Sequence, residues 1–202
     1  MIDGVSADTF ERRRGRLPHL AALADAGTVI ERLSAEVPGT SLPGRASILT
    51  GAPARDNGIY GNRVFDAERA AFRYASPYDV RLPTLLRMAR EAGRRSASIG
   101  MGMVRPEDAD LFARPWWVGA FVQRARDARP EPLANGWERV AGHVDAAGSL
   151  NAAARRVGVP DDFDDLDVHD EQTAAMVGFL GDRRVAEWVG AVATSDDAPD
   201  LI

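Results

Sequence analysis

The amino-acid sequence predicts an α/β fold in which a mostly parallel sheet is flanked by helices. Short apolar segments that suit strands alternate along the chain with segments of helical period, as this fold class requires. Hydrophobic residues make up 45% of the chain and charged residues 27%, a composition typical of a soluble globular protein with a sizeable core. The length of 202 residues is compatible with one domain.

The N-terminal elements are expected in the order strand, helix, strand. Residues 1–3 suit the end of a strand, residues 17–26 a helix, and residues 28–33 a second strand. This order is the start of the α/β pattern, and a further helix is expected to follow it.

Residues 37–62, VPGTSLPGRASILTGAPARDNGIYGN, combine a hydroxyl side chain, the start of that helix and a tight polar loop. Pro43 suits a first helical position, and the helix is expected to continue through Leu49 until Gly51 ends it. Ser41 therefore lies at or near the N-cap, where unpaired amide donors and the helix dipole favour a phosphate or sulfate oxyanion and ease ionisation of an attacking hydroxyl. A simple helix cap is the plainer interpretation of Ser41 taken alone.

The middle of the chain continues the alternation. Residues 65–74 are expected to form an exposed or edge segment, and residues 82–92 a helix with Pro83 in its first turn and Gly93 at its end. The buried side of that helix is expected to include Leu85, Leu86 and Met88. Residues 96–99 then suit a short buried strand.

The C-terminal part is expected to contain one long helix and two surface segments. Residues 124–135 are charged and contain prolines, which indicates a surface connection. Residues 161–170, DDFDDLDVHD, lack the glycine and terminal glutamate of a calcium loop and the second histidine of a zinc helix, so a solvated acidic loop is the better interpretation. Residues 171–192 suit a helix. Its buried side is expected to include Ala174, Met176, Val177 and Leu180.

Five motifs of this chain occur in an order and spacing that resemble a known family. They are Ile2-Asp3-Gly4, then Pro18-His19-Leu20-Ala21-Ala22-Leu23 with Gly27, then Pro38 with Ser41, then Thr50-Gly51, and finally Gly58-Ile59-Tyr60-Gly61-Asn62. Together they resemble the N-terminal part of the alkaline phosphatase superfamily, in its type I phosphodiesterase/nucleotide pyrophosphatase branch. That branch has an (I/V)DG aspartate, a P-x-L-x-x-L-x-x-x-G helix, a Thr or Ser nucleophile, a T-G pair and a G-I-x-x-N loop.

The resemblance implies an alkaline-phosphatase-like fold and a metal-dependent hydrolase of small phosphoester substrates. Asp3 would bind one of two divalent, zinc-like ions, and Ser41 would be the metal-bound nucleophile. Asn62 would bind substrate by donating a hydrogen bond to a non-bridging oxygen. The chemistry is coherent, because coordination to a dication stabilises a serine alkoxide and a second ion polarises the phosphoryl oxygen. Taken singly, Asp3 also suits a strand-end turn, and Asn62 suits left-handed backbone geometry.

The aromatic residues Trp116 and Trp117 allow two interpretations. Residues 111–122 resemble a region that many relatives use to line or cover a substrate pocket. Ordinary packing is the favoured interpretation of two adjacent tryptophans.

The residues around Ser41 also fit the motif of a second family. Ser41-Leu42-Pro43-Gly44-Arg45 also fits the (C/S)-x-P-x-R pattern of sulfatases, in which Ser41 would be oxidised to formylglycine and Arg45 would help to hold it and the metal. Sulfatases resemble one another in a paired aspartate after the first strand, whereas here Gly4 and Val5 follow Asp3. They also usually carry a G-K-W-H type segment, and this chain contains no lysine. Sulfatase is therefore the alternative function.

The remaining metal ligands of the branch, two aspartates and three histidines in downstream motifs, have no counterpart here. Residues 1–202 are therefore expected to be the N-terminal portion of a single hydrolase domain that is truncated at both ends. Asp3 and Ser41 alone are too few to hold two catalytic ions, since zinc sites typically use about three protein ligands each. We expect little turnover from this chain alone, and a non-catalytic truncated product is a further alternative.

Charge and composition exclude several other classes of function. The net charge of −5 and the absence of a dominant basic stripe argue against a nucleic-acid scaffold. The chain has no cysteine, which excludes disulfides, thiolate catalysis and zinc fingers. No apolar run approaches the length of a membrane span and no leader is visible in the sequence. Compartment, oligomeric state and substrate identity do not follow from the sequence.

Overall fold

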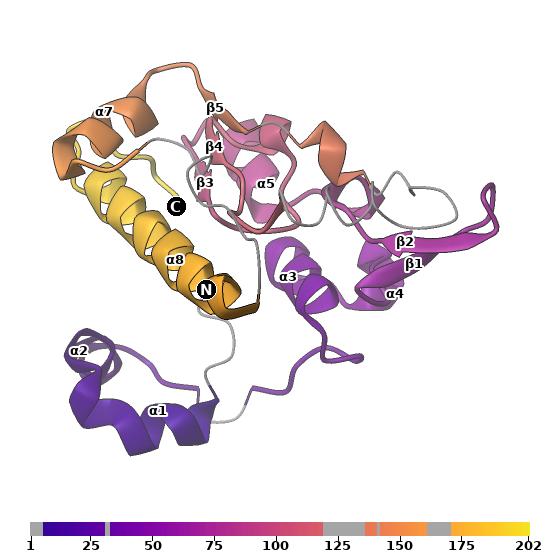
Figure 1. The fold of residues 1–202 in the computed structure, drawn as a ribbon, viewed down its shortest axis with the longest axis horizontal. Coiled ribbons are helices and arrows are strands. Elements are labelled where there is room, and N and C mark those ends of the chain that lie inside the picture. Colours follow the sequence, from indigo (N-terminus) through magenta and orange to yellow (C-terminus); the bar gives the residue numbers. More distant parts are fainter. Residues whose placement is uncertain (1–5, 31–32, 119–135, 141, 161–170) are drawn as a thin grey trace.

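A computed structural model describes residues 6–30, 33–118, 136–140, 142–160 and 171–202 (Figure 1). The helices are α1 Ala7–Arg13, α2 Pro18–Ala26, α3 Ser41–Thr50, α4 Ala54–Asn57, α5 Leu85–Glu91, α7 Ser149–Val157 and α8 Glu171–Ala193. The strands are β1 Arg63–Asp66, β2 Ala71–Tyr74, β3 Ala97–Ile99, β4 Leu111–Ala113 and β5 His143–Asp145. Short 3-10 turns occur at Arg14–Arg16, Pro77–Asp79, Pro106–Asp108 and Trp137–Arg139. The described chain is thus a mixed α/β structure, as expected.

The sheets differ from the expected mostly parallel arrangement. β1 and β2 form an antiparallel hairpin, while β3 pairs with β4 in parallel and β4 pairs with β5 antiparallel. Leu201 adds a parallel bridge to Ser96, just before β3. Hydrophobic pattern predicts that a segment is a strand, but it does not specify the direction in which its neighbour runs, so the antiparallel pairs went unpredicted.

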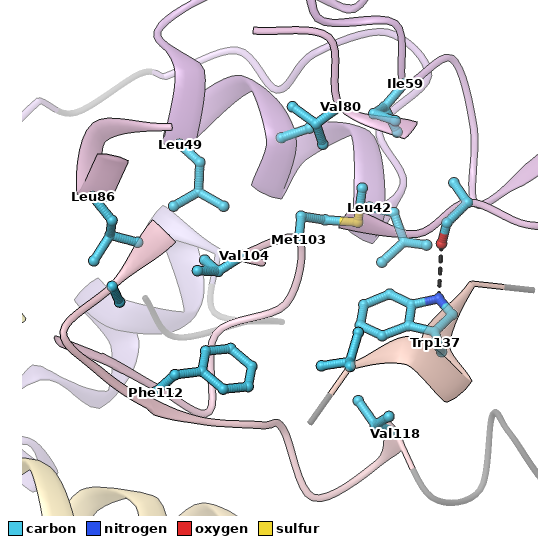
Figure 2. Close-up of a cluster of buried hydrophobic side chains, with 14 residues drawn as sticks. Leu42, Leu49, Ile59, Val80, Leu86, Met103, Val104, Phe112, Val118 and Trp137 are labelled. Carbon is cyan, nitrogen blue, oxygen red and sulfur yellow. Dashed lines mark hydrogen bonds between the residues drawn. The ribbon is translucent and has the colours of Figure 1, made fainter. Parts of the chain in front are cut away.

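Two hydrophobic clusters stabilise this arrangement. The first packs α3 and the loops after it against β4 and the 3-10 turn at Trp137–Arg139. In Figure 2 the Met103 side chain lies beside Leu42 and Val80, and Trp137 donates from its indole Nε1 to the carbonyl oxygen of Ala75 at 2.8 Å. The second cluster packs β3 and β4 against α7 and α8, with Trp188 fully buried in it.

The expected strand at residues 28–33 is wrong for the residues that are described there. Residues 28–30 and Leu33 form no helix or strand, and Val29, Ile30 and Leu33 are 49%, 70% and 81% exposed. A strand is stabilised by a hydrogen-bonded neighbour, and among the described residues none pairs with this segment. The expected strand at residues 1–3 lies outside the described residues.

Helix α2 matches the expected helix at residues 17–26, and it lies with α1 apart from the rest of the molecule in Figure 1. No residue of either helix is buried. The expected edge segment at residues 65–74 is confirmed as exposed: it contains β2 and the second half of β1, and Phe65 and Phe72 meet edge to face on its surface with ring centroids 5.4 Å apart.

Helix α5 begins later than expected. Its N-cap is Thr84, whose hydroxyl accepts a hydrogen bond from the Arg87 amide, so Pro83 lies before the helix rather than in its first turn. Leu86 is buried, but Leu85 and Met88 are 48% and 40% exposed, which contradicts their expected burial. Three residues apart on a helix, Leu85 and Met88 share a face, and that face is the one left open.

The C-terminal predictions had mixed outcomes. The helix at residues 171–192 is confirmed as α8. Leu180 is 38% exposed, which contradicts its expected burial, while the side chains of Ala174, Met176 and Val177 lie outside the described part of the structure. The buried residues of α8 that are described include Trp188, Ala191 and Val192. Residues 111–122 begin with β4, which was not predicted. The predicted segments at residues 124–135 and 161–170 lie outside the described residues. None of the helices that the structure describes is long and apolar enough to cross a membrane.

Packing of the tryptophans is confirmed for Trp117. Its ring meets that of Trp137 edge to face at a centroid distance of 5.1 Å, and it packs against the first hydrophobic cluster. Trp116 donates from its indole Nε1 to the Asp182 carboxylate on α8 at 2.9 Å. Both rings also line a cavity of about 650 Å³ that is bounded by residues of α3, α5, β3 and α8 and by Leu201 and Ile202.

Candidate active site

Helix α3 presents Ser41 as its first residue. The residue before it, Thr40, is the N-cap and has extended backbone geometry, and Gly51 ends the helix in the left-handed conformation with φ 65°. The predicted helix and its glycine stop are therefore confirmed. Pro43 is the third helical residue rather than the first, which the helix tolerates because the amides of the first turn have no partner within the helix.

The side chain of Ser41 is exposed, and within the described residues its hydroxyl makes no hydrogen bond. The N-cap position belongs to Thr40, and neither residue closes the helix with a side-chain cap. The interpretation of Ser41 as a helix cap is therefore wrong. Its hydroxyl is left available at the positive end of the helix dipole.

The N-terminus of α3 offers fewer backbone donors than expected. The Leu42 amide donates to Asn62 Oδ1 at 2.9 Å, Pro43 has no N–H, and the Gly44 amide donates to the Thr40 carbonyl at 3.2 Å. Only the amide of Ser41 itself remains without a partner in this first turn, as far as the described part of the chain extends. Stabilisation of an oxyanion here therefore depends on side-chain donors as well.

Asn62 lies beside Ser41 because its side chain bonds the next residue of the helix. A backbone amide can only donate, so the 2.9 Å contact with Leu42 fixes Oδ1 as the bonded atom and leaves Nδ2 as a donor pair. Asn62 does not have a positive φ, so left-handed geometry does not explain its presence. Of the three predicted site residues, the structure thus bonds Asn62 to the backbone of Leu42, the residue that follows Ser41.

Two sets of contacts hold the hairpin that follows Asn62. Its end returns to Asn62, whose carbonyl accepts from the Ala75 amide at 3.0 Å. Arg73 pairs with Asp79 through two hydrogen bonds of 2.8 and 2.6 Å. Burial acts to raise the pKa of Asp79, but the hydrogen bonds from Arg73 and from the Ser76 amide outweigh it, so this pKa lies below its ordinary value.

One residue of the site went unnoticed in the sequence, namely Asn57. It ends α4, is completely buried, and bonds both α3 and the loop that leads to Asn62. An asparagine followed by a glycine is typical of an ordinary turn, and nothing in the sequence indicates that Asn57 is buried.

Comparison with known proteins shows which family the chain matches. Residues 1–195 match the family described as "Type I phosphodiesterase / nucleotide pyrophosphatase". The chain belongs to this family. The match confirms the resemblance seen in the motifs and covers both Ser41 and Asn62. Members of this family are generally metal-dependent.

Solved structures that are similar to this family member include phosphonoacetate hydrolase from Sinorhizobium meliloti 1021. Its complexes with phosphonoformate and with phosphonoacetate each match at 22% sequence identity, with TM-scores of 0.41 and 0.42. Each match covers 88% of this chain and 48% of the solved chain. The chain therefore spans about half the length of the solved proteins that it matches.

The described residues do not by themselves fit a metal site. Asp3, the predicted metal-binding carboxylate, lies outside them. Within residues 6–30, 33–118, 136–140, 142–160 and 171–202, no group of three or more histidine, cysteine, aspartate or glutamate side chains converges. Ser41 supplies one oxygen, and a catalytic zinc site typically needs about three protein ligands.

Arg45, which the sulfatase pattern would place on the nucleophile, has another contact. Its guanidinium lies over the Trp117 ring, 5.4 Å from the centroid. This cation–π contact ties α3 to the first hydrophobic cluster and gives Arg45 a packing role.

Proposed function

We propose that this chain carries the nucleophile and one oxyanion donor of a phosphoester hydrolase of the phosphodiesterase/nucleotide pyrophosphatase type. Ser41 is the nucleophile and Asn62 is the donor. The observation that carries the proposal is the 2.9 Å hydrogen bond from the Leu42 amide to Asn62 Oδ1. Because Leu42 directly follows Ser41, this bond holds the Asn62 side chain against the first turn of α3, which begins at Ser41.

The chemistry of these two residues is a displacement at phosphorus. Ser41 Oγ gives up its proton to solvent and forms a bond to phosphorus while the bond from phosphorus to the leaving oxygen breaks. Water then attacks phosphorus, and the Ser41 hydroxyl is restored as the phosphoryl group leaves. The helix dipole at Ser41 stabilises developing negative charge on Oγ. Asn62 Nδ2 stabilises a non-bridging oxygen in the transition state.

The proposal includes metal binding only for the complete domain. We infer that two divalent ions, zinc-like in their chemistry, support the reaction in the complete domain, with Asp3 and Ser41 among their ligands. When bound, such ions supply Lewis-acid stabilisation of the phosphoryl oxygens. The residues described here do not hold them alone, so no step of the reaction is assigned to them.

We also propose that residues 1–202 form the N-terminal portion of a single alkaline-phosphatase-like hydrolase domain. The cavity of about 650 Å³ beside Leu201 and β3 supports this, because its lining is largely apolar and it adjoins a sheet edge that accepts a parallel neighbour. On this proposal the chain alone has little turnover. If it has none, the chain is a non-catalytic truncated product.

Substitution of Ser41 tests the proposed nucleophile. In the complete domain, Ser41→Ala should lower the turnover of an aryl phosphodiester by several orders of magnitude, because the covalent route is lost. Thr40→Ala, one residue away at the N-cap, is the matched control and should cost far less. Full activity in the alanine variant at position 41 would exclude Ser41 as the nucleophile. Preference for aryl sulfates together with an oxidised Ser41 would instead support the sulfatase alternative.

A further inference from the structure

We propose that Asn57 is a positioning residue that holds the Asn62 loop against helix α3, and so sets the place of Asn62 relative to Ser41. The inference rests on the proposed function for its catalytic meaning. Its structural content stands on contacts within α3, α4 and the loop between α4 and β1. Asn57 is not expected to touch substrate, because its side chain is completely buried.

The Asn57 side chain joins three separate stretches of backbone or side chain. Its Nδ2 donates to Ser47 Oγ on α3 at 3.1 Å and to the Ala52 carbonyl after α3 at 2.9 Å. Its Oδ1 accepts from the Ile59 amide at 2.9 Å. Both Nδ2 hydrogens and the oxygen are thus used, which fixes the orientation of the amide.

The loop that Asn57 holds leads directly to Asn62. Gly58 turns the chain with φ 88°, and a side chain there would collide with Arg81, so the turn has little freedom. Ile59 is completely buried in the same hydrophobic cluster as Leu42 on α3. Three residues later, Asn62 returns to α3 and accepts from the Leu42 amide. The loop is therefore pinned to α3 at Ser47 near one end of the helix and at Leu42 near the other.

A polar residue at a completely buried position requires a reason beyond hydrophobic packing. An apolar side chain at position 57 would leave the Ile59 amide and the Ala52 carbonyl without these partners in the core. A fully satisfied amide specifies one geometry, whereas an apolar contact tolerates sliding. That property suits a residue whose task is to place another side chain within a narrow range.

Amide hydrogen exchange of the 202-residue chain tests this inference without any activity measurement. The Leu42 amide reports directly on its bond to Asn62, and the Val192 amide in α8 reports on the rest of the molecule. Asn57→Asp keeps the acceptor for Ile59 but loses the Nδ2 donors. The protection of Leu42 relative to Val192 should fall about tenfold, as for the loss of one hydrogen bond.

Three further variants keep the test decisive. Ser47→Ala removes one acceptor without burying a charge, and it should lower the same ratio by a smaller amount even if Asn57→Asp fails to fold. Thr84→Ala is the matched control, since it removes the buried cap of α5 and should leave the ratio unchanged. Asn62→Ala should lower the ratio most, because it removes the bonded oxygen itself.

The outcomes separate this inference from the proposed function. An unchanged Leu42-to-Val192 ratio in Ser47→Ala and in any folded variant at position 57 overturns the positioning role of Asn57, whatever the activity of Ser41 variants. A lowered ratio supports the positioning role, and the turnover of Asn62→Ala in the complete domain then decides independently whether Asn62 is placed for catalysis.

Discussion

At the scale of single residues, the oxygen and the nitrogen of the Asn62 side-chain amide have separate roles. Its oxygen accepts from Leu42 and satisfies an amide of the first turn of α3, which would otherwise lack a partner. Its nitrogen makes no hydrogen bond within the described residues and is left to donate. The first turn of α3 has little else to offer an oxyanion, because Pro43 has no N–H and the Gly44 amide is already bonded.

Replacement of Asn62 should therefore separate catalysis from metal binding. In the complete domain, Asn62→Ala should lower turnover by about a hundredfold, the cost of losing one oxyanion donor, while the metal content stays intact. Asp3→Asn is the contrasting variant and should act through lost metal. Steady-state kinetics combined with elemental analysis of both variants checks the prediction. Turnover unchanged in Asn62→Ala would remove Asn62 from the site.

At the scale of elements, the N-terminus of α5 illustrates a buried carboxylate. Asp108 is only 5% exposed, and Thr84 Oγ1 donates to it at 3.2 Å while also capping α5. Burial raises the pKa of Asp108 above its ordinary value of 3.8, and the Thr84 hydrogen bond offsets this only in part.

This shift predicts a pH dependence of stability. Because the pKa of Asp108 is higher in the folded chain than in the unfolded chain, the folded form holds the proton more tightly. Its contribution to stability is then full below pH 3.8 and is lost as the pH rises through the folded pKa. The free energy of unfolding of Asp108→Asn, measured relative to the parent by urea titration, should therefore rise from acid to neutral pH. A pH-independent difference would contradict this.

The same scale shows which elements the sequence could predict. Helices α2, α3 and α8 were predicted because their apolar spacing and terminal glycines or prolines are local signals. Burial within α5 was predicted wrongly, since the exposure of Leu85 and Met88 depends on what lies beside the helix and not on its own sequence. Strand direction and the β4–β5 pair failed for the same reason, because pairing is a long-range property.

The candidate site, like the fold, was predicted only in part. Ser41 and Asn62 were predicted from local motifs, and in the structure Asn62 bonds the amide of Leu42, which follows Ser41. The bond between Asn62 and Leu42 links residues 20 positions apart, and the burial of Asn57 depends on packing against α3, so neither could be predicted from local sequence. Asp3 lies outside the described residues, and its role stays a prediction.

At the scale of the whole molecule, the described residues leave an apolar region open beside β3. The cavity of about 650 Å³ lies beside the edge where Leu201 pairs with Ser96, and Ile48, Leu85 and Ile202 in its lining are exposed. A sheet edge that only a single-residue bridge covers, with exposed apolar side chains around it, readily pairs with another chain.

We therefore expect the isolated 202-residue chain to self-associate. Sedimentation velocity at increasing protein concentration should show dimers or larger species, and the thermal transition should depend on concentration. A monomer at all concentrations with a sharp, concentration-independent transition would contradict this expectation. Zinc retained in stoichiometric amount through dialysis would contradict the inference that the chain alone lacks a complete metal site.

The central claim is that Ser41 forms a covalent bond to phosphorus, and its most direct test is to trap that bond. The complete domain is mixed with an aryl phosphodiester, quenched rapidly in acid and mapped by peptide mass spectrometry. Our account predicts an adduct on Ser41 that retains the phosphorus and the unreacted ester group, together with an otherwise unmodified serine before substrate is added. An adduct on another residue, or a Ser41 already oxidised to formylglycine, would contradict it.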